Sequence, residues 1–169
     1  MKSIIKMTGT LMAQMHADLR RPHGHAHERV GFVTAGCSWR PDGSLVVLAR
    51  EYLPVADEDY IRNARVGAMV GPDAMRKGLQ RAYGTRSALL HVHTHGGLGV
   101  PEFSSVDIEG GKQFVPSFFS VVPYMPHGLM VLSNDSAKCL LWTSEAKRPV
   151  RVDHFVSVGA QVARFGEAA

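Results

Sequence analysis

The sequence has little cysteine and no long apolar segment. Only Cys37 and Cys139 are cysteines among its 169 residues, which is too few for a cage of cysteine ligands around a structural zinc ion. The segment from Met1 to Thr10 lacks the long apolar run of a secretory leader. No stretch approaches the roughly 20 apolar residues that a membrane-spanning helix needs. These absences predict a protein of the reducing cytoplasm that does not span a membrane.

Clustered positive charge is also missing. The 19 Lys and Arg residues exceed the 15 Asp and Glu residues by four, but they are scattered, and Arg20-Arg21 is the only tight pair. No aromatic platform with basic flanks is present, as proteins that bind single-stranded nucleic acid use. We therefore expect solvated charge and no nucleic-acid partner.

The chain shows no internal repeat, low-complexity tract or linker. A chain of this length buries roughly 70% of its unfolded surface around a single core. We therefore predict one domain over residues 1–169 that folds without disulfides or a structural metal. A metal, if the protein binds one, would serve chemistry.

Apolar spacing and turn signals predict a mixture of helices and strands. Helices are predicted at 10–20, 72–83 and 104–113, and strands at 30–35, 45–52, 87–93, 118–122, 129–133 and 138–143. The turn signal Arg40-Pro41-Asp42-Gly43 predicts a hairpin between the first two strands. Residues from Val150 onward are not assigned. The mixture indicates an α+β fold.

Histidine is the residue in surplus, with nine copies, and six of them lie in two clusters at period two. The second cluster is His91, His93 and His95. Residues two apart on a strand point to the same side, so His93 and His95 at a strand end can present two imidazoles to one ion. The pair His91 and His93 is the alternative, but it lies farther along the chain from the acidic residue considered next.

A third ligand is available at the start of the following helix. If Ser104 is the N-cap, Asp107 lies in the first helical turn, and a glycine-rich loop lets that turn fold back over the strand end. Two imidazoles and one carboxylate leave one coordination position of zinc open, which is typical of a catalytic site. Ser-x-x-Asp is also an ordinary capping pattern, and histidines on a strand are often only packed or solvated. One geometry nevertheless accounts for all these residues, so we predict one Zn2+ per chain.

A hydrolytic zinc site also needs a general base, and Glu28 is the candidate. It precedes a predicted strand, and Gly31 three residues later permits a close backbone approach.

The remaining candidates are weaker. The first histidine cluster, His23, His25 and His27, follows a proline and has no carboxylate cluster nearby beyond Glu28, so we expect no second metal site there. Cys37 is expected to pack and not to act as a nucleophile.

Glu-x-x-Gly before a strand, followed by His-x-His and Ser-x-x-Asp, resembles the JAMM metal motif of the JAB/MPN domain, the fold of zinc-dependent deubiquitinating isopeptidases. The run Glu28-Arg-Val-Gly-Phe32 and the preceding Arg21-Pro-His23 are most similar to small bacterial members found beside ubiquitin-like modifiers and their activating and conjugating enzymes. The resemblance implies a single JAB/MPN domain, cytidine-deaminase-like, with a mixed β-sheet flanked by helices.

The resemblance also implies roles for individual residues. His93, His95 and Asp107 would be the zinc ligands, Glu28 the base, and Ser104 the oxyanion support. The activity would be hydrolysis of the amide bond after the tail of a ubiquitin-like protein, in precursor processing or deconjugation. Ubiquitin-activating-like and ubiquitin-conjugating-like enzymes would be possible partners. The alternative is a non-catalytic MPN scaffold in a protein complex.

Two departures from the family pattern concern the loop. Gly96 stands where proline is usual, and one extra residue precedes Ser104, so that Phe103 falls at the expected serine position. A bulge among the glycines accounts for this, and Ser105 is the alternative oxyanion support. The connection 56–70 is a candidate wall of the substrate groove, or simply a solvated loop.

Overall fold

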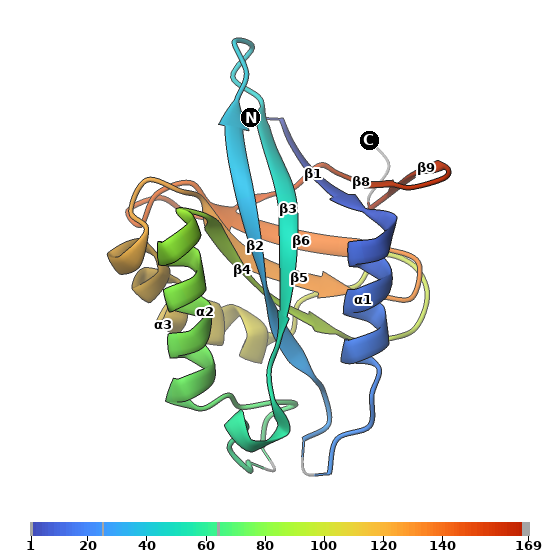
Figure 1. The fold of residues 1–169 in the computed structure, drawn as a ribbon, viewed down its shortest axis with the longest axis vertical. Helices are drawn as coiled ribbons and strands as arrows, with labels where there is room; N and C mark the ends of the chain where they lie inside the picture. The colour runs from blue at the N-terminus through green and yellow to red at the C-terminus, as the bar shows by residue number, and fades with distance from the viewer. Residues whose placement is uncertain (1, 25, 64, 167–169) are drawn as a thin grey trace.

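The computed structural model describes residues 2–24, 26–63 and 65–166. These residues form one mixed, curled sheet of nine strands with three α-helices (Figure 1). The strand order is β7-β6-β5-β4-β2-β3-β1-β8-β9. The predicted α+β class is therefore confirmed.

The helices and strands alternate along the chain. They are β1 Ser3–Thr8, α1 Gly9–Leu19, β2 Val30–Trp39, β3 Leu45–Pro54, the 3-10 helix η1 Asp57–Asp59, α2 Pro72–Thr85, β4 Ala88–Thr94, α3 Ser105–Val121, β5 His127–Leu132, β6 Ala137–Trp142, β7 Val150–Arg151, β8 His154–Val158 and β9 Val162–Phe165.

Strands β2 and β4 lie side by side in the middle of the sheet. β2 pairs antiparallel with β3 across the predicted hairpin turn, and antiparallel with β4 on its other side. Val30 at the start of β2 is opposite His93 near the end of β4. This register brings the segment before β2 to the strand end that carries the histidines.

The sheet is covered on both faces, because side chains alternate between the faces along each strand. Val33 and Ala35 of β2 join the apolar core that includes Leu11, Met15 and Leu19 of α1. Phe32 belongs to a second core, which includes Phe118 of α3 and Ala74 and Ala82 of α2. Helix α1 accordingly lies on one side of the central strands and α2 on the other (Figure 1).

Helix α3 corrects one prediction. The strand predicted at 118–122 is wrong, and so is the early end of the preceding helix at Gln113, because α3 continues to Val121 and includes Pro116. Val115, Phe118, Phe119 and Val122 are all buried in the second core. Their spacing of three and four residues is helical.

Several strands were not predicted. β1 lies between β3 and β8, and it pairs parallel with both. The unassigned segment after Val150 forms β7, β8 and β9. The helix predicted at 72–83 runs two residues further, and Arg86 in the left-handed conformation (φ 49°) ends it.

Two further properties concern membranes and thiols. Across the described residues, no helix is both long enough and apolar enough to cross a membrane. Both cysteines are free thiols. Burial raises the pKa of Cys37 to about 12 and that of Cys139 further still, so neither is a nucleophile near neutral pH.

Candidate metal centre

The end of strand β4 brings two imidazoles together. The Nε2 atoms of His93 and His95 lie 3.1 Å apart. The His93 side chain is 3% exposed, whereas His95 is 27% exposed. As the strand period predicted, both rings point to the same side of β4, at the boundary between the second core and solvent.

The carboxylate of Asp107 lies against both rings. Oδ1 is 3.4 Å from His93 Nε2, and Oδ2 is 3.5 Å from His95 Nε2. Ser104 caps α3, because its hydroxyl accepts the Asp107 N–H at 3.1 Å while Asp107 Oδ2 accepts the Ser104 N–H at 2.7 Å. This reciprocal capping holds the carboxylate over the strand end.

The ionised form of Asp107 is strongly favoured over the protonated form. Burial acts to raise its pKa, but the interaction with His93 and the hydrogen bonds from Ser104 outweigh burial and hold the pKa well below its usual range. The lowered pKa favours the ionised carboxylate, which is the form in which an aspartate binds a metal.

The spacing of the three side chains suits a small divalent cation. Zinc binds imidazole nitrogen and carboxylate oxygen at roughly 2.0–2.2 Å in tetrahedral sites, so neighbouring ligand atoms are about 3.4 Å apart. Here the two imidazole nitrogens are 3.1 Å apart, and each lies 3.4–3.5 Å from one oxygen of the Asp107 carboxylate, His93 from Oδ1 and His95 from Oδ2. Without a metal, two facing neutral imidazole nitrogens can form only one hydrogen bond, with one nitrogen as donor and the other as acceptor. With a metal, both nitrogens can donate an electron pair to the same cation.

Glu28 approaches the same point from the start of β2. Its Oε1 lies 3.9 Å from His95 Nε2. One ligand atom from each of Glu28, His93 and His95 falls within 4.8 Å of the others, so this group could hold a metal ion. The Nδ1 atom of His93 is buried and has no hydrogen-bond partner among the described residues.

Glycines allow the close packing around Glu28. The Gly67 carbonyl accepts the N–H groups of His27 and Glu28 at 2.8 and 3.1 Å. A Cβ at Gly67 would lie 2.6 Å from the Glu28 carboxylate. Gly31, identified in the sequence, is packed just as closely, because a Cβ there would lie 2.4 Å from the Tyr52 ring.

Arg29 anchors the segment that carries Glu28. Its side chain is only 2% exposed and pairs with Asp57 of η1 at 2.7 Å. It also donates to the backbone carbonyls of Arg21 and Pro22, each at 2.9 Å. The hydrogen bond with Asp57 raises the pKa of Arg29. This buried cation ties the loop before β2 to η1.

The two serine candidates occupy different positions. Ser104 is the exposed N-cap, and its hydroxyl lies 2.8 Å from Asp107 Oδ2. Ser105 is the first residue of α3. Ser104 thus contacts the Asp107 carboxylate next to the imidazoles. In the loop before Ser104, Gly96, Gly97 and Gly99 have positive φ values of 64°, 67° and 82°. Glycine adopts such positive φ values without strain.

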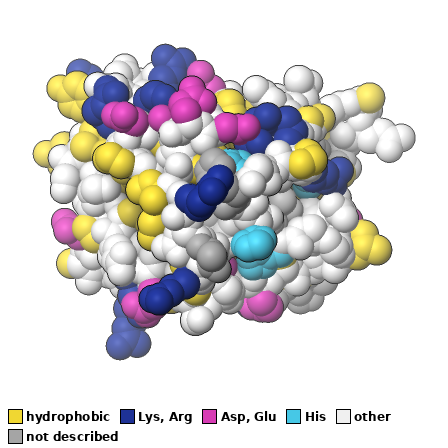
Figure 2. Space-filling model, turned by 90° about the horizontal axis from the view of Figure 1, so that it is seen from below, with side chains coloured by type: hydrophobic (Ala, Val, Ile, Leu, Met, Phe, Trp, Pro, Cys, Tyr) yellow, Lys and Arg dark blue, Asp and Glu magenta, His cyan; other side chains and the backbone are white. Residues whose placement is uncertain are grey.

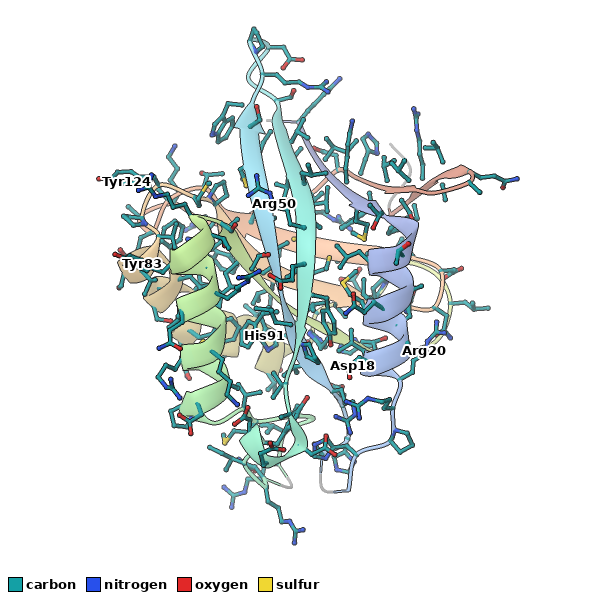
Figure 3. The ribbon with its side chains drawn as sticks, in the orientation of Figure 1. Asp18, Arg20, Arg50, Tyr83, His91 and Tyr124 are labelled. Atoms are coloured by element: carbon teal, nitrogen blue, oxygen red, sulfur yellow. The ribbon has the colours of Figure 1, made fainter. Side chains whose placement is uncertain are left out.

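His91 is separate from this cluster. Its ring packs on Phe114 and Phe32, with centroids 4.9 and 5.8 Å away. In Figure 3 it lies between α2 and the central strands. Burial lowers the pKa of His91 to about 3. The alternative pair His91 and His93 is therefore less well placed than His93 and His95, whose nitrogens face each other.

The first histidine cluster forms no comparable arrangement in the described part of the chain. His23 packs edge-on against Tyr60, and its Nδ1 accepts the Ala26 N–H at 3.1 Å. His27 is exposed. His25 lies outside the described residues. Figure 2 shows the end of the molecule that contains these loops, with histidine, basic and acidic side chains at its surface.

The connection 56–70 lies beside the metal centre. Ile61 N–H donates to the Met69 carbonyl at 2.8 Å, and Tyr60 forms a bridge with Val70. Val66 and Ala68 of this connection line the hollow around Glu28 and His93. The connection therefore lines the hollow at the candidate metal centre, and its role as a wall of a substrate groove stays a prediction.

Sequence reasoning missed Gly67 and Arg29. Gly67 lies in a loop without any periodic pattern. The hydrogen bonds that its carbonyl accepts come from His27 and Glu28, about 40 residues earlier in the chain. Arg29 was noted only as part of a run after Glu28. Its position just before an apolar strand was a signal for burial, but nothing in the sequence indicated its partners.

Comparisons with known proteins assign no family to the chain. No family model matches the sequence, and no curated protein matches it. Among solved structures, the N-terminal domain of STIL from Trichoplax adhaerens has a TM-score of 0.38 and 9% sequence identity, covering 82% of this chain. This chain spans 40% of that structure's length. A likeness of this degree carries no argument about function.

Proposed function

We propose that the protein is a zinc-dependent amide hydrolase of the JAB/MPN type. The observation that carries this proposal is the set of Nε2 and carboxylate atoms of His93, His95 and Asp107, which are 3.1 to 3.5 Å apart with Glu28 beside them. Two imidazoles and one carboxylate suit zinc, and they leave a position open.

Each residue then has a chemical role. His93, His95 and Asp107 hold zinc, which when bound lowers the pKa of a coordinated water and polarises a carbonyl. Glu28 accepts the proton of the attacking water and returns it to the departing amine. Its side chain is 32% exposed, so it can exchange protons with a bound substrate. Ser104 donates a hydrogen bond toward the developing negative charge.

We propose the tail of a ubiquitin-like protein as the substrate, in either precursor processing or deconjugation. Support comes from the resemblance of the four-part motif and from the connection 56–70, which walls the site on one side. An extended tail could bind along such a wall, with backbone pairing and side-chain pockets. Activating-like and conjugating-like enzymes of the same pathway are the proposed partners, and the reducing cytoplasm is the proposed compartment.

The test separates metal binding from hydrolysis. We expect about one zinc per chain in the wild type, loss of zinc in His95→Ala, and retained zinc in Glu28→Gln with hydrolysis reduced by about 10²- to 10⁴-fold. Metal content is measured by elemental analysis. Hydrolysis is measured by the intact mass of a ubiquitin-like protein, encoded beside this one, that carries a C-terminal extension.

His154→Ala is the control, because His154 is an exposed histidine of β8 away from the centre, and it should keep both properties. Full hydrolysis by Glu28→Gln would refute the role of Glu28. Absence of zinc from wild-type protein after gentle purification would favour the scaffold alternative.

A further inference from the structure

The metal centre opens into a second, larger cavity. The hollow around Glu28 has a volume of about 140 Å³, and the neighbouring cavity about 670 Å³. Both are lined by His91, His93 and Asp107, so the two spaces adjoin. A molecule bound at the metal centre can therefore extend directly into the larger cavity.

The larger cavity is mainly apolar. Its walls come from the connection 56–70, helix α2, helix α3 and the sheet. The apolar side chains that line it are Val30, Ile61, Val66, Ala68, Met69, Val70, Met75, Val106, Phe114 and Leu129. A cavity of this size and lining is typical of a site for an organic group of moderate size.

His91 supplies a polar group in this apolar wall. Its ring is fixed by Phe32 and Phe114, yet the structure gives it no hydrogen bond to any other described residue. A neutral imidazole carries one donor and one acceptor nitrogen. A group that enters the cavity thus meets mainly apolar walls and the His91 ring, which lies next to the candidate metal ligands, while Ser105, Glu109 and Gln113 of α3 supply the other polar side chains of the lining.

We propose that this cavity binds a tyrosine side chain of the substrate, with the aromatic ring among the apolar residues and the phenol hydroxyl hydrogen-bonded to His91. Tyrosine combines a large apolar body with a polar tip, which matches both parts of the lining. An aliphatic or phenylalanine side chain would leave His91 unpaired, and a charged one would lose its hydration. That this tyrosine belongs to the substrate, near the cleaved amide, rests on the proposed function.

Side-chain analogues test the cavity without requiring any hydrolysis. The full-length protein, labelled with ¹³C at the methionine methyl groups, is titrated with p-cresol and separately with toluene. We expect the Met69 and Met75 signals, assigned by Met→Leu variants, to shift in both titrations. The hydrogen bond should make p-cresol bind about 2- to 12-fold more tightly than toluene.

Variants at position 91 identify the hydrogen-bonding partner. His91→Leu keeps the cavity apolar and should bind p-cresol no more tightly than toluene, whereas His91→Gln should retain a preference for p-cresol. His154→Leu should behave as the wild type. Equal affinity for the two ligands in the wild type, or an unchanged preference in His91→Leu, would overturn the role of His91. Failure of both ligands to shift Met69 and Met75 would overturn the cavity as a binding site.

A peptide series then tests the link to the substrate. Peptides with tyrosine, phenylalanine or glycine at each position within four residues of the amide are offered to the zinc-loaded enzyme. We expect one position at which tyrosine gives kcat/KM several-fold above phenylalanine, and His91→Leu should remove the difference. Equal rates for tyrosine and phenylalanine at all positions would contradict the proposal. Absence of hydrolysis in all peptides, with p-cresol binding retained, would instead contradict the proposed function.

Discussion

At the scale of single residues, the centre depends on how closely backbone segments approach the functional side chains. The carbonyl of Gly67 accepts two N–H groups from the segment at Glu28. The Glu28 carboxylate also lies close to Gly67, since a Cβ there would be 2.6 Å from Glu28 Oε2. A residue with no functional group of its own therefore limits where the carboxylate can lie.

We expect Gly67→Ala to displace Glu28 while leaving the zinc ligands in place. The new methyl group would lie 2.6 Å from Glu28 Oε2, so either the side chain or the loop must move. Hydrolysis of the tail substrate should fall at least about tenfold, since general-base catalysis requires hydrogen-bond reach. Zinc content should stay near that of the wild type. Gly24→Ala is the control, because a Cβ there meets no atom within 4 Å. Full activity in Gly67→Ala would show that Glu28 is not held by this contact.

The residues with distinctive chemistry were predictable, and those that position them were not. His93 and His95 were assigned to one side of a strand by period alone, and Asp107 to a first helical turn by its distance from Ser104. The structure brings these side chains together. Gly67 and the contacts of Arg29 arise from segments that meet only in the folded chain, so no local pattern encodes them.

At the scale of elements, helix α3 connects the chemistry to the core. Its first turn carries Asp107 and is closed by the Ser104 capping box. Its later turns place Phe118 and Phe119 in the second core. A disturbance of the cap therefore affects both the stability of the helix start and the position of the carboxylate.

We expect Ser104→Ala to lower the free energy of unfolding by about 1 kcal/mol, because one N-cap hydrogen bond is lost. Urea denaturation of the zinc-free protein measures this change. Ser105→Ala should alter stability by no more than about 0.5 kcal/mol, as for most exposed positions. If Ser104 also supports the oxyanion, Ser104→Ala should lower kcat by about 10²- to 10³-fold; measured zinc content shows whether this loss comes from the missing hydroxyl, with zinc retained, or from a displaced Asp107, with zinc weakened. A larger loss of kcat in Ser105→Ala than in Ser104→Ala would transfer that role to Ser105.

The errors at this scale have a physical origin. The run Phe118 to Val122 is short, apolar and β-branched at its end, and it follows Pro116, so local propensity favours a strand after a helix break. The burial of Phe118 against Phe32 of β2 and His127 of β5 overrides that propensity, since tertiary packing supplies most helix stability. β1 was missed because Ser3–Thr8 alternates over only six residues.

At the scale of the whole molecule, the sheet has a substantial core on each face. One core contains α1 and the other contains α2 and α3. The metal centre lies at the ends of β2 and β4 and contributes few side chains to either core. We therefore expect folding not to require a metal, because the two apolar cores contain none of the candidate metal ligands.

We expect the zinc-free protein to unfold in one cooperative transition. Zinc should raise its stability by mass action, by about 2.7 kcal/mol when free zinc is 100 times its Kd. Thermal or urea unfolding with EDTA, and then with added zinc, measures both quantities. His95→Ala should show the same cooperative transition but little response to zinc. Loss of cooperative unfolding in EDTA would mean that the centre is structural.

The position of β1 constrains how the chain can fold during its synthesis. β1 precedes the other described strands in the chain, but it lies between β3 and β8, and Ser3 N–H bonds to the Asp153 carboxylate 150 residues away. One edge of β1 thus stays unpaired until β8 has left the ribosome. Exposed strand edges promote association between chains. While the segment between β1 and β8 is being synthesised, the nascent chain therefore carries an open edge on β1, and the sheet closes over this edge only when β8 is available.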